Sequence, residues 1–308
     1  MSKPVFQTRA RGKLLLTGEY AVLDGALALA VPVRFGQSLQ VEALETDSTL
    51  LWRAGNPEGV WLESRFQLPD LAILQTNDAP AAERLAQILH AARRLNPAFL
   101  QQQSGLLVST QTDFPRNWGL GTSSTLIAAL ARWADADPYQ LLADTFGGSG
   151  YDIACAYAET PILFRLDDGR PQASAVDFRP AFTPQLYFIF LGKKQDSREG
   201  IRRYREKTGR DKGPVQRISE LTQRAVEAGS LAGFEEVLSE HEHLLSQLLE
   251  LPRARDLYFP DYWGEIKSLG AWGGDFVLAT SARSEAETRA FFNEKGFGVF
   301  MRWNEMIK

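Results

Sequence analysis

The sequence has little cysteine and little histidine. Cys155 is its one cysteine among 308 residues, so an internal disulfide and a cysteine-rich zinc site are both excluded. The three histidines, His90, His241 and His243, are too few and too scattered for a metal cluster. For the pair at 241 and 243 we expect solvated helix surface, because residues two apart on a helix point to different faces.

The sequence also lacks long apolar runs and an excess of positive charge. No apolar run reaches the roughly 18 residues that a transmembrane helix needs, and the first residues lack the apolar core of a signal peptide. We therefore expect a cytoplasmic protein with no membrane partner. The formal net charge of -4 argues against a nucleic-acid partner, which normally requires a basic face. The length suits one large domain or two lobes.

The order of the expected elements is typical of an α+β fold. A β-rich opening precedes the first long helix, and helical periodicity dominates after about residue 197. We expect strands within 12–66 and at 105–111, 161–166, 185–192, 274–280 and 298–303, and helices at 78–95, 122–134, 138–146, 197–207, 214–228, 231–251, 262–269 and 284–295. A boundary at 182–185 would divide the chain into two lobes.

A glycine-rich loop, W-G-L-G-T-S-S, leads directly into an apolar helix. It consists of Trp118, Gly119, Leu120, Gly121, Thr122, Ser123 and Ser124. Glycine lets a backbone approach a phosphate closely, and hydroxyls at a helix start can reach phosphate oxygens or a magnesium ion. The loop is therefore a candidate phosphate-binding site; the alternative is a glycine-rich turn with Ser/Thr helix capping.

Two charged residues, Lys13 and Asp152, stand close to other turns that contain glycine. Lys13 stands near the start of a predicted strand that ends in the turn G-E-Y, and its ammonium could neutralise phosphate charge. Asp152 follows the turn G-G-S-G and precedes an apolar, strand-like run, so we expect a partly desolvated carboxylate that can accept a proton from a substrate hydroxyl. The alternatives are a solvated lysine and a helix-capping aspartate. A further glycine segment, K-S-L-G-A-W-G-G-D-F at 267–276, could approach a ligand or simply form a tight turn.

Together these motifs resemble those of the GHMP small-molecule kinases. The matching segments, in the order of that family, are G-K-L-L-L-T-G-E-Y-A-V, P-R-N-W-G-L-G-T-S-S-T, S-G-Y-D and G-A-W-G-G-D. The resemblance spans nearly the whole chain. It implies a two-lobed fold, with an N-terminal lobe like ribosomal protein S5 domain 2 at 1–183 and a ferredoxin-like C-terminal lobe at 184–308.

The resemblance also implies roles for individual residues. The glycine-rich loop would bind the phosphates of ATP, and Ser124 would contact Mg2+. Lys13 would steady the transferring phosphoryl group, and Asp152 would be the base or the orienting carboxylate. The residues expected beside the substrate are Glu19, Tyr20, Gly150, Tyr151, Gly270, Ala271, Gly273 and Gly274.

Two departures from the family pattern stand out. Many relatives have a magnesium-binding glutamate upstream of S-G-x-D, whereas this chain has L-L-A-D-T-F there. Asp144 could substitute as a metal ligand, although a solvated helix residue is the alternative. In the late glycine segment, Trp272 and Asp275 stand where the family has glycines, which would narrow the site or add a stacking surface.

The acceptor is expected to be a small molecule of the mevalonate (isoprenoid) pathway. G-E-Y, and S-G-Y-D followed by I-A, look more like phosphomevalonate kinases than mevalonate kinases. We expect phosphomevalonate slightly ahead of mevalonate, with homoserine and sugars behind them. A basic group could hold an acceptor phosphate or carboxylate, with a solvated helix as the alternative: Lys193, Lys194, Arg198, Arg202 and Arg203.

Two further functions are compatible with the same motifs. One is a diphosphomevalonate decarboxylase, although S-G-Y-D fits the kinases better. The second is a non-catalytic binding protein that keeps the fold without phosphoryl transfer. A homodimer is compatible with each of these functions.

Overall fold

The computed structural model describes residues 4–45, 48–101, 104–192, 197–208, 213–270, 272 and 274–308. The chain folds into two compact units, and each is assembled from several segments. The first unit comprises Met1–Gly12, Phe35–Arg116 and Gly121–Tyr157. The second unit comprises Lys13–Arg34, Asn117–Leu120 and Ala158–Lys308. The predicted lobes 1–183 and 184–308 stay a prediction.

The first unit is built on a mixed β-sheet. Its strands are β1 (Phe6–Thr17), which continues into the second unit as does β2 (Ala28–Leu44), then β3 (Thr49–Asn56), β4 (Gly59–Gln67), β5 (Ile73–Thr76) and β6 (Gly105–Thr112). Within this unit the hydrogen-bonded order is β5-β4-β3-β6-β2, and β1 pairs with β2. The β3–β6 pair is parallel, whereas β4 and β2 pair with their neighbours in antiparallel fashion.

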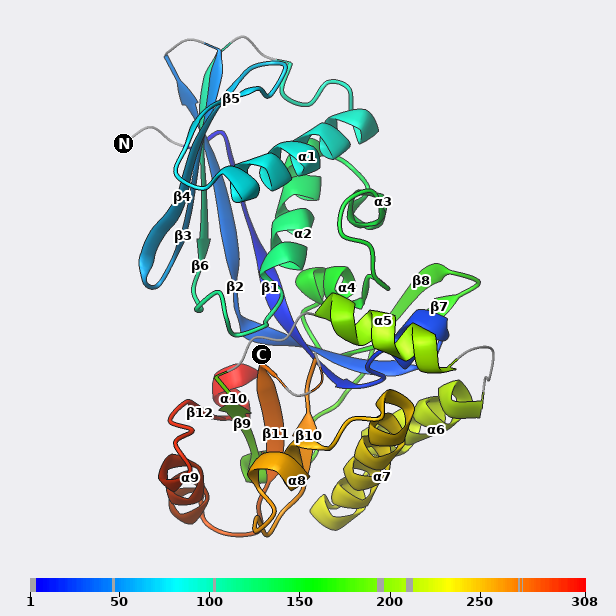
Figure 1. Cartoon of the computed structure of the whole chain (residues 1–308). Helices are drawn as coiled ribbons and strands as arrows, with labels where there is room; N and C mark the ends of the chain where they lie inside the picture. The colour runs from blue at the N-terminus through cyan, green and yellow to red at the C-terminus, as the bar shows by residue number, and fades with distance from the viewer. Residues whose placement is uncertain are drawn as a thin grey trace. The chain divides into compact units, whose positions relative to one another are not determined.

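Helices α1 (Ala79–Leu95), α2 (Thr122–Ala134), α3 (Pro138–Ala143) and α4 (Tyr151–Tyr157) complete the first unit. Helix α1 begins where its sequence predicts, because the Asp78 side chain accepts a hydrogen bond from the Ala81 N–H at 3.1 Å. Asp137 caps α3 in the same way. Figure 1 shows α1 and α2 against one face of this sheet.

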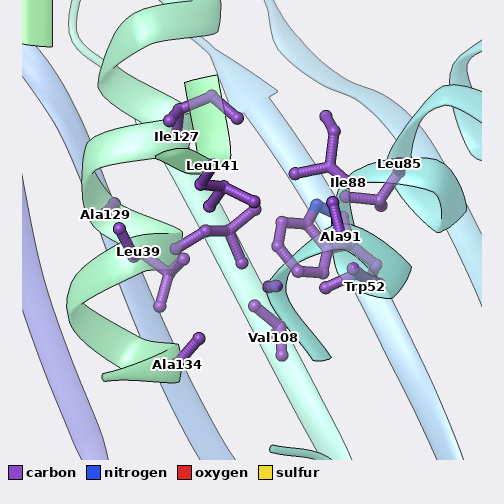
Figure 2. Packing of buried hydrophobic residues seen from close by; sticks show 14 of the residues in the cluster. Leu39, Trp52, Leu85, Ile88, Ala91, Val108, Ile127, Ala129, Ala134 and Leu141 are labelled. Carbon is purple, nitrogen blue, oxygen red and sulfur yellow. The ribbon is translucent and has the colours of Figure 1, made fainter. Parts of the chain in front are cut away.

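The core of the first unit lies between this sheet and its helices. Figure 2 shows side chains from β3, β6, α1, α2 and α3 meeting there, with the indole of Trp52 among them. Trp52 is 1% exposed, and truncating a buried side chain of this size typically costs about 3–5 kcal/mol. The core thus holds α2, and with it the last residues of the glycine-rich loop, on a rigid base.

The second unit contains two sets of paired strands. Strands β7 (Ile162–Asp167) and β8 (Arg170–Ala175) form a hairpin, and β7 pairs with residues 28–30 of β2. A separate antiparallel sheet has the order β10-β11-β9-β12, formed by β9 (Leu186–Phe190), β10 (Ile266–Ser268), β11 (Phe276–Thr280) and β12 (Phe300–Arg302).

The helical segments of the second unit are η1 (Ala21–Asp24), η2 (Thr183–Gln185), α5 (Ser197–Thr208), α6 (Gly213–Glu227), α7 (Leu231–Leu249), α8 (Ala254–Tyr258), α9 (Glu285–Glu294) and α10 (Trp303–Met306). Helices α6 and α7 pack side by side, and α7 also contacts β10 (Figure 1). None of the helices in the described part of the chain combines the length and apolar character needed to cross a membrane.

The predicted α+β class is confirmed, and most predicted elements are found within a few residues of their expected ends. Three predictions are wrong, and one of them, the strand-like run expected after Asp152, is described with the site below. Residues 262–269 were expected to be helical but contain β10, because residues 266–268 pair with β11. Of the pair expected on solvated helix surface, His243 is exposed as predicted, whereas His241 is completely buried in α7.

Candidate functional site

Lys13 is held against the glycine-rich loop within the second unit. Its backbone N–H donates a hydrogen bond to the Leu120 carbonyl at 3.0 Å. Its ammonium donates to the Gly119 carbonyl, also at 3.0 Å, although Gly119 lies 106 positions later in the chain. The structure therefore brings the ammonium of Lys13 into contact with the backbone of the glycine-rich loop.

Close packing also shapes the first residues of the glycine-rich loop. Gly119 has φ of +67°, a region that favours glycine, and a Cβ at this position would overlap the carboxylate of Asp275. The Trp118 ring packs against Phe276 in an edge-on geometry, with ring centroids 5.6 Å apart. The glycine is thus required both by the backbone conformation and by the neighbouring side chain.

The last residues of the loop, Gly121 to Ser124, form the start of α2 in the first unit. Gly121 is the N-cap with φ of +95°, and within the described chain no side chain caps this helix end. The hydroxyl of Ser124 donates a hydrogen bond to the Gly121 carbonyl at 2.9 Å. Backbone N–H groups and the helix dipole therefore give this end the character of an anion site.

Asp152 lies in the first turn of α4, not ahead of a strand as predicted. Its Oδ1 accepts a hydrogen bond from the Ile153 N–H at 3.0 Å. The run that follows is helical because it is rich in alanine, which has the highest helix propensity, and because it packs on α2. The hydroxyl of Tyr157 fixes this packing through a 3.0 Å bond to the Ala128 carbonyl.

Gly150 and Tyr151 lead into α4. Gly150 has φ of +87°, and a Cβ there would come within 2.9 Å of the Tyr139 ring, so the turn needs glycine. Burial raises the pKa of the Tyr139 hydroxyl, with smaller like-charge contributions that include Asp152. Tyr139 therefore stays protonated at neutral pH. Tyr151 is half-buried beside Asp152 in the sequence.

Glu19 takes part in a buried charge cluster that sequence reasoning missed. Lys267 of β10 donates to Glu19 Oε1 at 2.5 Å and lies 3.2 Å from Glu242 Oε1. The N–H of Gly18 donates to Nε2 of His241 at 3.0 Å. Glu19 is 2% exposed, and the other three side chains are 0% exposed. We call Glu19, His241, Glu242 and Lys267 the buried charge cluster.

The pKa values in this cluster follow from burial and from its single cation. Burial raises the pKa of Glu19, and it raises that of Glu242 to about 7 despite the nearby lysine. For Lys267, burial lowers the pKa, but Glu19 and Glu242 outweigh it and raise the pKa overall. Burial and the charge of Lys267 hold the pKa of His241 well below its usual range. His241 is thus neutral, which agrees with Nε2 accepting the Gly18 N–H.

One sequence signal could have pointed to this cluster. Lys267 stands in E-I-K-S-L, between the apolar residues Ile266 and Leu269, which favours a buried position. A lysine is almost never fully buried unless it is paired, so an acidic partner was to be expected. The sequence offers 38 acidic residues, however, and it does not show which of them lies beside β10.

Tyr20 lies next to the cluster and inside the second unit. Its hydroxyl accepts a hydrogen bond from the Trp272 N–H at 2.9 Å, and its ring stacks on Tyr204 with centroids 6.1 Å apart. Tyr20 is 7% exposed. The predicted substrate contacts of Glu19 and Tyr20 stay predictions, and both side chains already have protein partners.

Part of the late glycine segment lies in the described residues. Gly270 has φ of +69°, Gly274 is buried and Asp275 has φ of +50°. Ala271 and Gly273, which were also predicted to line the substrate site, lie outside the described residues. The segment is joined to β9 by a 2.8 Å bond from the Leu191 N–H to the Asp275 carbonyl.

The predicted metal ligands are Ser124 and Asp144. Asp144 is the C-cap of α3, is exposed, and accepts a hydrogen bond from Gln140 at 2.8 Å. Among the described residues there is no group of three or more His, Cys, Asp or Glu side chains that could hold a metal ion.

The basic group proposed for acceptor binding is only partly described. Lys193 and Lys194 lie outside the described residues, as does the side chain of Arg198. Arg203 donates to the Leu249 carbonyl at 2.6 Å, so its guanidinium caps the C-terminus of α7. Arg202 is exposed and lies 3.9 Å from Glu206.

Comparisons with solved structures identify proteins with a similar fold. No family model matches the sequence, and no curated protein matches it. Among solved structures, L. major mevalonate kinase in complex with R-mevalonate superposes with a TM-score of 0.69 and 17% identity, over 98% of both chains. Methanococcus jannaschii mevalonate kinase gives a TM-score of 0.71 and 14% identity, over 96% of both chains.

A third solved structure is similar to the same extent. Streptococcus pneumoniae phosphomevalonate kinase, in complex with phosphomevalonate and AMPPNP, gives a TM-score of 0.70 and 18% identity, over 97% of this chain and 100% of its own. At these identities the likeness concerns the path of the backbone. The chain has the fold of the GHMP small-molecule kinases.

Proposed function

We propose that this chain is an ATP-dependent kinase that transfers the γ-phosphoryl group to an oxygen atom of a small molecule. The observation that carries the proposal is the junction of Lys13 with Gly119 and Leu120. It joins a cation to the backbone of a glycine-rich loop that opens a helix, which suits binding of a nucleotide's phosphates. The shared fold and the four motifs support the same function.

In this proposal the chain binds and balances the charge of the ATP phosphates. The N–H groups at the start of α2, which no side chain in the described part of the chain caps, would bind phosphate oxygens, and Ser124 would contact the Mg2+ that accompanies the nucleotide. The metal ion supplies further positive charge at those phosphates. Lys13 neutralises charge on the transferring group. Because a loose phosphoryl transition state needs little covalent help, positioning and charge carry most of the rate.

Asp152 is the proposed base or orienting carboxylate for the acceptor hydroxyl. It stands at the start of α4, where one of its oxygens is held by the Ile153 N–H. A carboxylate with a fixed orientation can accept the hydroxyl proton as the oxygen attacks phosphorus. Gly150 and Tyr151 are proposed to lie beside the acceptor.

The proposed acceptor is an intermediate of the mevalonate pathway, with phosphomevalonate slightly favoured over mevalonate. The structural relatives include one solved with R-mevalonate and one solved with phosphomevalonate and AMPPNP. The G-E-Y and S-G-Y-D segments of this chain favour the second acceptor. Homoserine and sugars remain possible acceptors within the same fold.

The test is a screen of the purified chain for ADP release from Mg-ATP with mevalonate, phosphomevalonate, homoserine and hexoses. We expect turnover with phosphomevalonate or mevalonate, and mass spectrometry should identify the phosphorylated product. Turnover with hexoses alone would contradict the pathway assignment. Release of carbon dioxide from diphosphomevalonate would indicate a decarboxylase instead.

A non-catalytic ligand-binding protein with this fold is the competing function. The observation that favours it is the carboxylate of Asp275, which occupies the space next to Gly119 where the family has a glycine in the late segment. A negative charge there opposes phosphate binding unless a cation balances it. Nucleotide binding without turnover of any acceptor would favour this function.

A further inference from the structure

The segment at the end of β1, residues 17–20, is bonded to four different later parts of the second unit. The partners are the hydroxyl of Thr222 for Thr17, the ring of His241 for Gly18, the ammonium of Lys267 for Glu19 and the N–H of Trp272 for Tyr20. These four bonds measure 2.8, 3.0, 2.5 and 2.9 Å. The strand that carries Lys13 is thus attached at its end to α6, α7, β10 and the late glycine segment.

The ammonium of Lys267 contacts several of the groups that hold this segment. An ammonium has three N–H donors, and three acceptors surround this one. They are Glu19 Oε1 at 2.5 Å, the Ser268 carbonyl at 2.6 Å and Glu242 Oε1 at 3.2 Å. Glu242 is fixed in turn by the Ser268 hydroxyl, which donates to its Oε2 at 3.1 Å. A buried ammonium that donates two hydrogen bonds and forms an ion pair with a second carboxylate holds these partners in defined directions.

Both carboxylate oxygens of Glu19 lie close to other side chains of the protein. Oε1 accepts from Lys267, and Oε2 lies 3.6 Å from Nε2 of His241. Because Glu19 is 2% exposed and Lys267 is 0% exposed, loss of Lys267 leaves Glu19 as a buried carboxylate without its cation. The pair therefore determines the position of the turn much more strongly than a surface ion pair would.

We propose that Lys267 is a positioning residue for phosphoryl transfer, which acts by holding Glu19 and thereby fixing the strand that carries Lys13. The inference rests on the proposed function and makes it more specific. It assigns Glu19 a role through Lys267 rather than in substrate contact. Lys13 is four positions before Thr17 on β1, so a displaced turn shifts Lys13 relative to Gly119.

The test compares Lys267→Met, Lys13→Met and the double variant with the wild-type protein. We expect Lys267→Met to lower kcat about 100-fold, as a displacement of about 1 Å can do, while KM for the acceptor changes less than about 3-fold. Because Lys267 acts through Lys13, the double variant should be no slower than Lys13→Met. Lys295→Met is the matched control, since Lys295 pairs with Asp261 at the surface, 2.8 Å away.

A merely structural role predicts a different pattern. The melting temperature of Lys267→Met would then fall while kcat per folded molecule stayed at the wild-type value; that pattern would overturn the proposal. If Lys267→Met does not fold, Glu19→Met takes its place, because it removes the acceptor of the Lys267 ammonium while Glu242 still balances that charge. A kcat loss of about 10-fold at unchanged KM supports the proposal, and wild-type kcat contradicts it.

Failure of the proposed function is recognised separately, by a wild-type protein that turns over no acceptor. The same variants are then compared by calorimetric titration with AMPPNP. Equal, non-additive losses of affinity in the Lys267 and Lys13 variants support positioning. Additive losses, or no binding by the wild-type protein, overturn it.

Discussion

The ammonium of Lys13 lies 3.0 Å from the carbonyl oxygen of Gly119, and it donates a hydrogen bond to that oxygen. The contact orients a cation on the loop that is proposed to bind phosphate. A donor that is already oriented stabilises transition-state charge more effectively than one that must reorganise.

Replacing Lys13 by Met should therefore lower kcat/KM for phosphoryl transfer by about 10²- to 10³-fold. Steady-state kinetics at saturating Mg-ATP will measure the loss. Lys207→Met is the control, because Lys207 pairs with Glu250 on the surface, at 2.6 Å, and should keep kcat within about twofold. A kcat/KM that is equal in both variants would contradict the role of Lys13.

Replacing Asp152 by Asn should lower kcat by orders of magnitude while nucleotide affinity is retained. The amide cannot accept the acceptor's proton, whereas the shape of the α4 start is preserved. Asp135→Asn is the matched control, since Asp135 is exposed and has φ of +49°, a conformation that asparagine tolerates. Wild-type turnover by the Asp152 variant would remove the carboxylate from the mechanism.

Replacing Gly119 by Ala should destabilise the protein more than replacing Gly147 by Ala. Both glycines have nearly the same φ, +67° and +68°, so the conformational cost of about 1–2 kcal/mol is shared. A Cβ at Gly119 would overlap Asp275, whereas among the described residues no atom lies within 4 Å of a Cβ at Gly147. Urea unfolding should therefore give an extra loss of about 1–3 kcal/mol for Gly119→Ala.

The double variant Gly119→Ala with Asp275→Gly isolates this overlap. Removing the carboxylate should recover most of the extra loss and leave the conformational cost. If the double variant unfolds at the same urea concentration as Gly119→Ala, or at a lower one, the overlap with Asp275 is not the cause of the extra loss of stability.

Replacing Glu242 by Gln should stabilise the protein at alkaline pH and change little at acid pH. The pKa of Glu242 is raised from 4.5 to about 7 in the folded protein, so folding favours its protonated form. Stability from this group is fully present below the unfolded pKa and is lost as pH rises through the folded value. At 1.36 kcal/mol per unit, the difference should reach a few kcal/mol above pH ~8.

The measurement is the difference in unfolding free energy between wild type and Glu242→Gln from about pH 4 to pH 9. The difference is needed because other groups face Glu242 or titrate beside it: Lys267, Glu19, His241 and Arg253. His241 contributes with the opposite sign, since its lowered pKa costs stability as pH falls. A difference that does not change with pH would contradict the raised pKa of Glu242.

Local signals in the sequence were sufficient for much of the fold. Asp78 and Asp137 predict helix starts because a carboxylate can cap the N–H groups of the next residues, and the structure has these bonds. The glycine-rich loop was recognisable for the same kind of reason: glycines with positive φ and an uncapped helix start are encoded within a few neighbouring residues.

Contacts between distant segments could not be derived in this way. The run after Asp152 is a helix and residues 266–268 form a strand because of what each packs against, α2 in the first case and β11 in the second. Both runs are short, so their periodicity fits either structure.

The sequence by itself determined the α+β class, the motifs and their order, because these depend on the residues next to one another. Only the tertiary structure decided that Glu19 is buried against Lys267 and that His241 faces inward. A buried charge is tolerated only beside its partner, and that partner is 248 positions away in the chain.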